Sequence, residues 1–358
     1  MEGVGLRHGD GWAVRDVSLS VRPGEFYTLL GPAGSGKTAL LRMLAGFAGP
    51  DAGRIVVDDE PIDAVPAQKR NLGMVFPRGA LWPHMSVFGN AAFGLRARGD
   101  SSAAAARKVE AALALVGLEG AGARRPSDLS PSEQLRVALA RALVVEPRLL
   151  LLDDPLSGLD AAPRALMRHE LARLQRDLGI TTLAATRDPA EACALSTRIA
   201  VLAGGGIAQE GKPEEIYWSP ASRFVAEFVG AANLLPVRVV ELRPLGVVVE
   251  TPGGARLPAP GGGREWRVGA RGLLCLRPEA LAVEEAARST GGIPGTVSSQ
   301  TFEGSRQIYE VRIGDSALRV EMLTSAALGR GFKPGDEVKV QVSPETSVLL
   351  PDEAAAPR

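Results

Sequence analysis

Residues 31–38 read GPAGSGKT; they follow an apolar run at residues 26–30 and precede a helical pattern at residues 38–44. The octapeptide satisfies G-x-x-x-x-G-K-[ST] in the order strand, loop, helix that this motif requires. Its glycines let successive backbone N–H groups turn toward a phosphate, and the N-terminus of the helix adds its dipole. The alternative is a plain glycine-rich turn. The pattern predicts a phosphate-binding loop made of Gly31, Pro32, Ala33, Gly34, Ser35, Gly36, Lys37 and Thr38.

Four leucines at residues 149–152 precede Asp153, as in a buried parallel strand. The carboxyl ends of parallel strands meet at one edge of a sheet, so we expect the Asp153 carboxylate beside the loop. There Lys37 would reach the β- and γ-phosphates, while Thr38 and Asp153 would hold Mg²⁺. Asp153 as a mere strand end is the simpler interpretation, but together the two motifs predict an ATP·Mg²⁺ site.

The overall composition limits the classes of partner that the chain is expected to bind. The 358 residues favour two domains, and the totals of Lys plus Arg and of Asp plus Glu are both 41, which gives no argument for nucleic-acid binding. Two distant cysteines, Cys193 and Cys275, fit a reducing cytosol. No window approaches the roughly 20 apolar residues of a membrane span. We therefore expect any attachment to a membrane to go through a partner.

The pattern of residue types along the sequence changes after residue 232. Before it, residues 17–30 predict two strands around Pro23-Gly24, residues 101–117 and 130–143 predict helices, and residues 180–185 and 199–202 predict further strands. A last helix is expected at 213–230. Beyond it, short β-branched runs at 237–242, 246–250, 273–276, 309–313 and 338–342 predict a small β barrel or sandwich, with a loop at 252–263 and a frayed tail at 353–358.

The motifs resemble the ATPase subunits of ABC importers, in particular the subgroup with a C-terminal TOBE domain (polyamine, ferric iron, sulfate, phosphonate and sugar systems). The resemblance covers nearly the whole chain and lies in LSPSEQLRVALARAL from Leu129, LLLLDDPLSGLD from Leu149, TRDPAEACALSTRIAV from Thr186, PEEIYWSPASRFVAEFVGAAN from Pro213, and Arg277-Pro278-Glu279. It implies an α/β P-loop domain with a helical insertion at residues 1–232 and an all-β TOBE domain, similar to an oligonucleotide/oligosaccharide-binding fold, at 233–358.

The resemblance also implies an assembly. Two protomers would enclose each ATP between one phosphate loop and the partner's signature helix, where Ser130, Ser132 and Asp160 would contact the partner's ATP. Closure of a homodimer, or of a heterodimer with an intact ATPase subunit, would drive integral-membrane permease subunits that receive cargo from an extracytoplasmic substrate-binding protein. The chain would then be a peripheral protein on the cytoplasmic face of the membrane.

Two assignments remain open between alternatives. His8 falls near the position where the family stacks an aromatic ring on adenine, and nearby Trp12 is the alternative. Residues 80–95, which include LWPHM, resemble the surface where a permease helix docks; the alternative is a local core beneath the helical insertion.

Three residues depart from the family pattern at the γ-phosphate. Pro77 replaces a glutamine and offers neither a side-chain amide nor a backbone N–H. Asp154 replaces the glutamate that acts as general base, and its reach is one methylene shorter, so we expect slower turnover. Arg187 replaces the switch histidine; it binds phosphate strongly but cannot accept a hydrogen bond, which favours retention of ATP.

The fourth departure is the signature itself, LSPSE at residues 129–133. Ser130, Pro131 and Glu133 form the pattern of a capping box with proline at the first helical position. We therefore expect the N–H groups at this helix start to be satisfied internally and to grip a partner's ATP poorly.

Three functions follow. The first is a transport ATPase subunit, which these departures would make slow. The second is a non-hydrolysing ATP-binding protein that acts as a regulatory or structural partner of a transporter, although pairing with an intact subunit would leave a defect in each composite site. The third, a phosphotransferase, lacks any apparent acceptor site.

Overall fold

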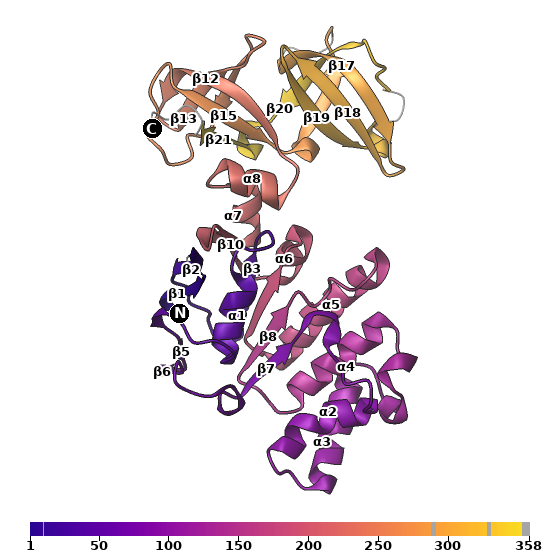
Figure 1. The fold of residues 1–358 in the computed structure, drawn as a ribbon. Coiled ribbons are helices and arrows are strands. Elements are labelled where there is room, and N and C mark those ends of the chain that lie inside the picture. Colours follow the sequence, from indigo (N-terminus) through magenta and orange to yellow (C-terminus); the bar gives the residue numbers. More distant parts are fainter. Residues whose placement is uncertain (10, 288–290, 328–330, 353–358) are drawn as a thin grey trace. The chain divides into compact units, whose positions relative to one another are not determined.

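The computed structural model describes residues 1–9, 11–287, 291–327 and 331–352 (Figure 1). The chain forms two compact units, Met1–Pro213 and Glu214–Arg358. The second unit therefore takes in the helical segment that precedes residue 233, while the domain boundary between residues 232 and 233 stays a prediction. Each unit is described by itself.

A six-stranded sheet forms the centre of the N-terminal unit, in the order β11-β10-β3-β9-β8-β7. All neighbours in it run parallel except β10 and β11. Every residue of β3, β8 and β9 is buried, as expected for central parallel strands that are rich in apolar residues. The strands are β3 (Phe26–Leu30), β7 (Leu72–Val75), β8 (Leu149–Asp153), β9 (Thr182–Thr186), β10 (Arg198–Ala203) and β11 (Gly206–Gly211).

Two smaller sheets complete the β structure of this unit. Their strands are β1 (Glu2–His8), β2 (Gly11–Val17) and β4 (Ala52–Arg54), and the pair β5 (Val56–Val57) and β6 (Glu60–Pro61). The prediction of two strands within residues 17–30 is half wrong: β3 forms, but no strand runs from Ser18 to the turn at Pro23-Gly24. Beyond Val17, Leu19 still exchanges hydrogen bonds with Met1, at 3.0 and 3.1 Å, and Pro23 has no N–H to donate to a ladder.

The helices of this unit are α1 (Lys37–Ala45), α2 (Val87–Ala97), α3 (Ser102–Leu115), α4 (Pro131–Leu143), α5 (Ala161–Leu178) and α6 (Pro189–Leu195). Short 3-10 turns lie at Ala67–Lys69, Pro77–Gly79, Ala121–Ala123 and Pro126–Asp128. Helices α2, α3 and α4 gather into a helical group beside the sheet (Figure 1), and their buried faces share one apolar core. This group is the predicted helical insertion, and the helices predicted at residues 38–44, 101–117 and 130–143 are confirmed.

A buried arginine fixes the far end of α1. The Arg70 guanidinium donates to the carbonyl oxygens of Met43 and Leu44, at 2.7 and 2.8 Å. These are two of the last carbonyls of α1, which have no partner within the helix, and a cation is favourable at this end of the dipole. Helix α1 is therefore held at both ends, by the loop before it and by Arg70 after it.

The C-terminal unit consists of two five-stranded antiparallel sheets preceded by two short helices. The helices are α7 (Pro213–Trp218) and α8 (Arg223–Val229). One sheet contains β12 (Asn233–Arg243), β13 (Gly246–Glu250), β14 (Arg256–Ala259), β15 (Arg271–Leu276) and β21 (Ser347–Pro351). The other contains β16 (Leu281–Glu285), β17 (Ile293–Phe302), β18 (Arg306–Ile313), β19 (Ser316–Leu323) and β20 (Glu337–Val342), and α9 (Thr324–Ala327) follows β19; 3-10 turns lie at Pro278–Ala280 and Pro344–Thr346. The predicted all-β architecture is confirmed.

Two predictions for this region are wrong in detail. The single helix expected at 213–230 is broken into α7 and α8, because Pro220 lies in the middle and cannot continue a helix. The loop expected at 252–263 contains β14, which pairs with β13. The tail predicted at 353–358 lies outside the described residues.

Arg277, after β15, is buried, and it ties this strand to the two helices. Its guanidinium donates to the carbonyl oxygens of Tyr217, Ala226 and Gly230, at 2.8–2.9 Å, and lies 4.2 Å from the centre of the Tyr217 ring. Since these carbonyls follow or end helices, one side chain satisfies several orphan acceptors. This gives the Arg277-Pro278-Glu279 turn a structural role.

Candidate functional site

The predicted phosphate loop lies between β3 and α1, with its lysine turned back onto the loop. Lys37 Nζ donates to the carbonyl oxygens of Gly31 and Pro32 and to Ser35 Oγ, at 2.7, 2.8 and 3.1 Å. Burial lowers the Lys37 pKa, and the positive charge of Arg187 lowers it further. A buried ammonium gains from a nearby anion, so the loop favours a phosphate at Lys37.

Two glycines in the loop are required by the space around them. A Cβ atom on Gly31 would lie 2.5 Å from the carbonyl oxygen of Leu202. Gly36 has φ +99°, and a Cβ there would lie 2.8 Å from the carbonyl oxygen of Ala13. Gly36 is also the N-cap of α1 and provides no side-chain cap, so the first N–H groups of α1 are left to the loop and its ligand.

Thr38 and Asp153 meet at the predicted edge of the sheet. Thr38 Oγ1 donates to Asp153 Oδ1 at 3.0 Å. The Asp153 carboxylate is buried, and burial raises its pKa. A hydroxyl and a buried carboxylate are oxygen donors of the kind Mg²⁺ takes, and Mg²⁺ commonly uses one or two such groups together with phosphates and water. The donor set at Thr38 and Asp153 therefore fits magnesium.

Asp154 and Arg187 form an ion pair beside these residues. Arg187 Nη2 lies 3.2 Å from Asp154 Oδ2. Asp154 has a left-handed backbone (φ +48°), and its N–H donates to the carbonyl oxygen of Ala185 at 2.8 Å. The end of β9 therefore holds the Asp154 backbone through the Ala185 carbonyl oxygen, and Arg187 follows two residues later in the chain.

Most of the predicted phosphate-site residues line a cavity of about 580 Å³. His8 lines it, whereas Trp12 does not; the Trp12 ring lies under the Arg7 guanidinium, 4.9 Å from its centre. Sequence reasoning did not identify Arg42 and Phe47, which also line the cavity. Arg42 follows Thr38 by four residues on α1, and this helical spacing places both on one face. The lining is Leu6, His8, Ala13, Ala33, Gly34, Ser35, Gly36, Lys37, Thr38, Ala39, Arg42, Phe47, Ala48, Pro77, Asp153, Asp154, Ala185 and Arg187.

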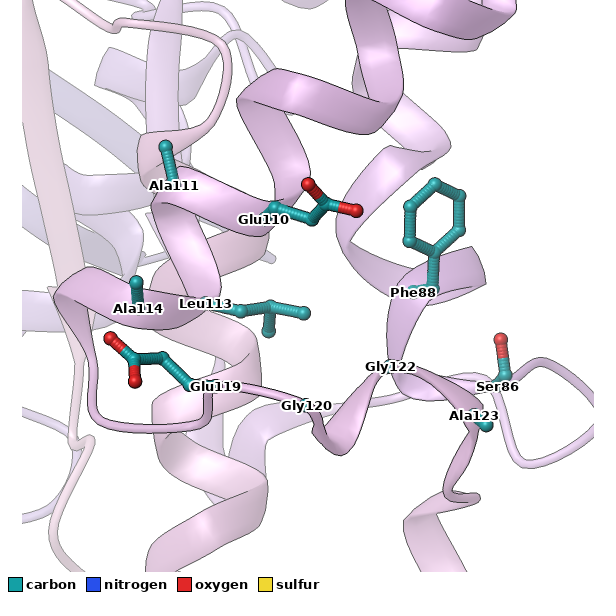
Figure 2. A pocket seen from close by; sticks show the side chains of 10 residues that line it. All are labelled: Ser86, Phe88, Glu110, Ala111, Leu113, Ala114, Glu119, Gly120, Gly122 and Ala123. Carbon is teal, nitrogen blue, oxygen red and sulfur yellow. The ribbon is translucent and has the colours of Figure 1, made fainter.

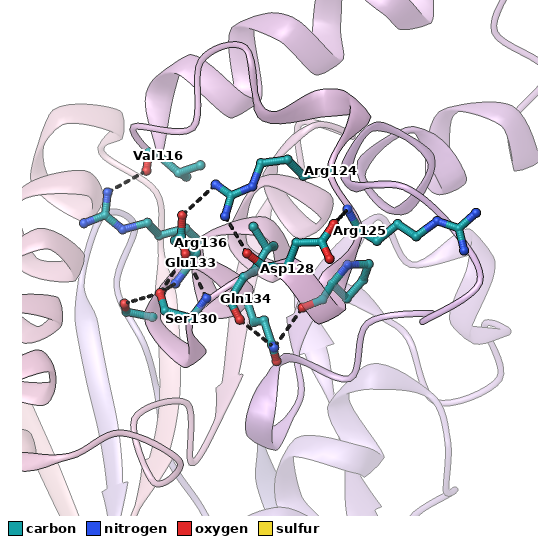
Figure 3. Close-up of polar contacts among 11 residues, drawn as sticks. Val116, Arg124, Arg125, Asp128, Ser130, Glu133, Gln134 and Arg136 are labelled. Atoms are coloured by element: carbon teal, nitrogen blue, oxygen red, sulfur yellow. Dashed lines mark hydrogen bonds and ion pairs between the residues drawn. The ribbon is translucent and has the colours of Figure 1, made fainter.

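The start of α4 is closed by its own side chains (Figure 3). Ser130 Oγ accepts from the Glu133 N–H at 3.3 Å, and Glu133 Oε2 accepts from the Ser130 N–H at 2.8 Å. Arg124 Nη1 holds the other Glu133 oxygen at 2.8 Å. The Ser130 N–H, then its hydroxyl and Arg124, lower the Glu133 pKa to about 2. The predicted capping box is confirmed.

The other signature residues lie apart from the cavity. Ser132 Oγ is 3.2 Å from Ser130 Oγ, within the same helix start. Asp160 is the N-cap of α5 but makes no side-chain cap bond. Ser130, Ser132 and Asp160 do not line the phosphate cavity of their own chain. Their contact with a partner's ATP stays a prediction.

The segment after β7 is pinned to α4. Pro77 begins a 3-10 turn, and Arg78 within the turn (φ +56°) and Ala80 just after it (φ +43°) have left-handed backbones. Arg141 donates to the carbonyl oxygens of Gly79 and Ala80, at 2.7 and 2.8 Å, and lies over the Trp82 ring. A change in the position of α4 would therefore move the residues next to Pro77.

Residues 80–95 provide both a core and a surface. Val87, Ala91 and Leu95 are buried in the helical core. Phe88, from the same helix, lines a hollow of about 850 Å³ together with Glu110 and Leu113 of α3 (Figure 2). The segment therefore contributes to a local core through one face of α2, and its role as a permease-docking surface stays a prediction.

Two features are absent from the ranges that the structure describes. In these ranges no helix combines the length and the apolar character that crossing a bilayer requires. The same ranges hold no group of three or more His, Cys, Asp or Glu side chains placed to bind a metal by themselves. A magnesium ion at Thr38 and Asp153 would thus rely on phosphate and water for its other ligands.

Known proteins share both halves of the chain. Residues 14–157 match the family model described as ABC transporter, and residues 274–350 match the TOBE domain model. The iron import ATP-binding protein FbpC 1 of Rhizobium meliloti is 42% identical over 92% of this chain and 90% of its own length. The spermidine/putrescine import ATP-binding protein PotA of Methylococcus capsulatus is 42% identical over 97% and 91%.

Solved structures of ATP-binding proteins also resemble this chain. The ATP-binding cassette MJ0796, in a dimeric post-hydrolysis state bound to ADP and phosphate, has a TM-score of 0.53 and 26% identity, covering 59% of this chain and 97% of its own. The cbiO1 protein of Clostridium perfringens has a TM-score of 0.56 and 28% identity, covering 64% and 90%. The chain therefore belongs to the ABC transporter family, among the ATP-binding subunits that carry a TOBE domain.

Proposed function

We propose that this chain is the ATP-binding subunit of a membrane importer and that ATP·Mg²⁺ binds at the phosphate loop. The observation that carries the proposal is the convergence of Lys37, Thr38 and Asp153 at one sheet edge. Lys37 and the N–H groups of the loop would bind the phosphates, while Thr38 and Asp153 would hold the metal. Bound Mg²⁺ would neutralise charge on the β- and γ-phosphate oxygens.

For the reaction, we propose Asp154 as the base that orients the attacking water and Arg187 as the group that binds the γ-phosphate. Asp154 has the chemistry of a general base but a short reach, and Pro77 contributes no side-chain donor or acceptor. Slow hydrolysis follows from these two properties. A protein that never hydrolyses ATP is the rival function, and the relatives named as import ATP-binding proteins favour the transport subunit.

We propose that the hollow beside Phe88 receives a cytoplasmic helix of a permease. It is bounded by the apolar side chains of Phe88 and Leu113 and by the carboxylates of Glu110 and Glu119. An apolar groove with acidic edges suits an amphipathic helix with basic flanks. The chain would then act at the cytoplasmic face of the membrane without entering it, and an external binding protein would deliver cargo to the permease.

The signature residues suit a dimer. Ser130, Ser132 and Asp160 lie outside their own phosphate cavity, so a second protomer must present them if they are to meet ATP. Either a second copy of this chain or an intact ATPase subunit fills that role. Because the capping box occupies the Ser130 N–H, we propose that ATP closes this dimer weakly.

The test is ATP binding and Mg²⁺-dependent hydrolysis by the purified full chain, with Lys37→Ala as background. We expect saturable binding and a turnover that is slow but above that of the variant. Binding with turnover equal to the background, even with the permease reconstituted, would support the non-hydrolysing rival. No binding of ATP would refute both.

A further inference from the structure

Arg42 lies on α1, one helical turn after Thr38, and lines the phosphate cavity. Side chains on a helix tilt toward its N-terminus, so the Arg42 side chain is directed back toward the loop that precedes α1. Burial raises the pKa of the Asp153 carboxyl, and the positive charge of Arg42 lowers it. Arg42 therefore acts electrostatically on the place where Thr38 and Asp153 meet.

The same arginine adjoins the wall of the cavity that Phe47, Ala48 and Pro77 form. The Arg42 carbonyl oxygen accepts from the Phe47 N–H at 2.9 Å, and the centre of the Phe47 ring is 6.1 Å from that of Phe76, the residue before Pro77. The three side chains of this wall carry no hydrogen-bond donor, and Pro77 has no backbone N–H either. The donor available beside this wall is the Arg42 guanidinium.

The other charged side chains of the cavity already have partners. Lys37 donates to two carbonyl oxygens of the loop, and Asp153 accepts from a threonine hydroxyl. Arg187 pairs with Asp154 at 3.2 Å. Within the part of the chain that the structure describes, the Arg42 guanidinium forms no ion pair or hydrogen bond, so it is the positive charge of this cavity that stays available to a ligand.

We propose that Arg42 contacts the terminal phosphate of a bound triphosphate from the side of Pro77, where the cavity wall supplies no donor of its own. A guanidinium fork suits the paired oxygens of a phosphate group. Lys37 is the first residue of α1 and Arg42 lies in its second turn, so the two cations hold the phosphates from different positions along the helix. This inference rests on the proposed binding of ATP at the phosphate loop, and it makes Arg42 a further residue that distinguishes a triphosphate from a diphosphate.

Calorimetric titration of the full chain tests the contact, with the magnesium complexes of adenylyl imidodiphosphate and ADP as the two ligands. We expect Arg42→Gln to weaken binding of the triphosphate analogue about tenfold and binding of ADP less than about twofold. Pro77→Gln adds a side-chain amide to the same wall, so in that background Arg42→Gln should weaken the analogue only about threefold. Arg107→Gln is the matched control, because it removes the same charge from an exposed position on α3, and its affinities should equal those of wild type.

Equal weakening of both ligands by Arg42→Gln would overturn the proposal, since it would mean attraction to any nucleotide and no contact with the terminal phosphate. An equal loss with Pro77 and with Gln at this position would also overturn it, because the contact would then not lie on the side of Pro77. Retained binding of ADP shows that each variant is folded. If wild type binds neither nucleotide, the proposed function itself fails; if wild type and Arg42→Gln bind both alike, only the Arg42 contact fails.

Discussion

Helices α1 and α4 both begin with an N-cap residue, but they treat their first N–H groups in opposite ways. At α1, Gly36 supplies no side chain, and the N–H groups remain for a ligand. At α4, Ser130 and Glu133 close the helix start with reciprocal hydrogen bonds, and Arg124 holds Glu133 in place. A helix N-terminus binds an anion well when no side chain of its own occupies its donors. The first helix start is therefore suited to a phosphate, and the second is stable at the cost of that ability.

Removing the lysine of α1 should have the largest effect. Lys37→Ala should weaken ATP binding by about 100-fold, because a charge-assisted contact to two phosphates is lost. The measurement is calorimetric titration with ATP and Mg²⁺. Lys69→Ala, which removes an exposed lysine, is the control and should bind like wild type. Retained affinity in Lys37→Ala would place the nucleotide elsewhere.

Lengthening the side chain of the proposed base, Asp154, should have the next largest effect. Asp154→Glu should raise single-turnover ATP hydrolysis by about tenfold or more, because a carboxylate misplaced by about 1 Å loses roughly that much or more. The affinity for ATP should change little by comparison. A rate equal to or below that of wild type would show that reach does not limit this site.

Opening the start of α4 should make it resemble the start of α1. Pro131→Gly with Glu133→Ala should strengthen ATP-dependent dimerisation about tenfold, since residue 133 then has no side-chain acceptor for the Ser130 N–H. Sedimentation in an Asp154→Asn background, which slows hydrolysis, measures the dimer. An unchanged dimer constant would mean that the capping box does not weaken closure.

The capping box should also contribute to stability in a pH-dependent way. Glu133→Ala should lower the free energy of unfolding by about 1 kcal/mol near neutral pH. The folded-state pKa of Glu133 is lowered to about 2 from 4.5, so its contribution is present above about pH 4.5 and is lost as the pH falls toward 2. Thermal unfolding of the two proteins across this range should converge at low pH. If the difference in stability between the two proteins did not change with pH, the effect would come from packing and not from the charge of Glu133.

Much of the fold and the phosphate site follows from local sequence. Residues 31–38 and the leucines before Asp153 predict their positions because a buried parallel strand must end at the edge where the loop begins. The capping box was predictable for the same reason, since its bonds join residues three apart. These features depend on neighbours in the chain.

Contacts between distant residues that no motif specifies were not predictable. The Arg187–Asp154 pair depends on β8 and β9 being adjacent, and a single sequence does not give the strand order. The choice of His8 over Trp12 in the cavity goes with the register of β1 and β2, which pairs Trp12 with Arg7 and His8 with Gly11. Arg277 gave a motif in sequence, but its carbonyl partners lie about fifty residues earlier in the chain.

The most direct test of the contrast between α1 and α4 is an experimental structure of the full-length Asp154→Asn variant with ATP and Mg²⁺. We expect the phosphates in the loop of α1, near Lys37 and Thr38, with the Ser130 N–H still bonded to Glu133. A closed dimer in which the Ser130 N–H bonds the partner's γ-phosphate and Glu133 has turned away would contradict the account.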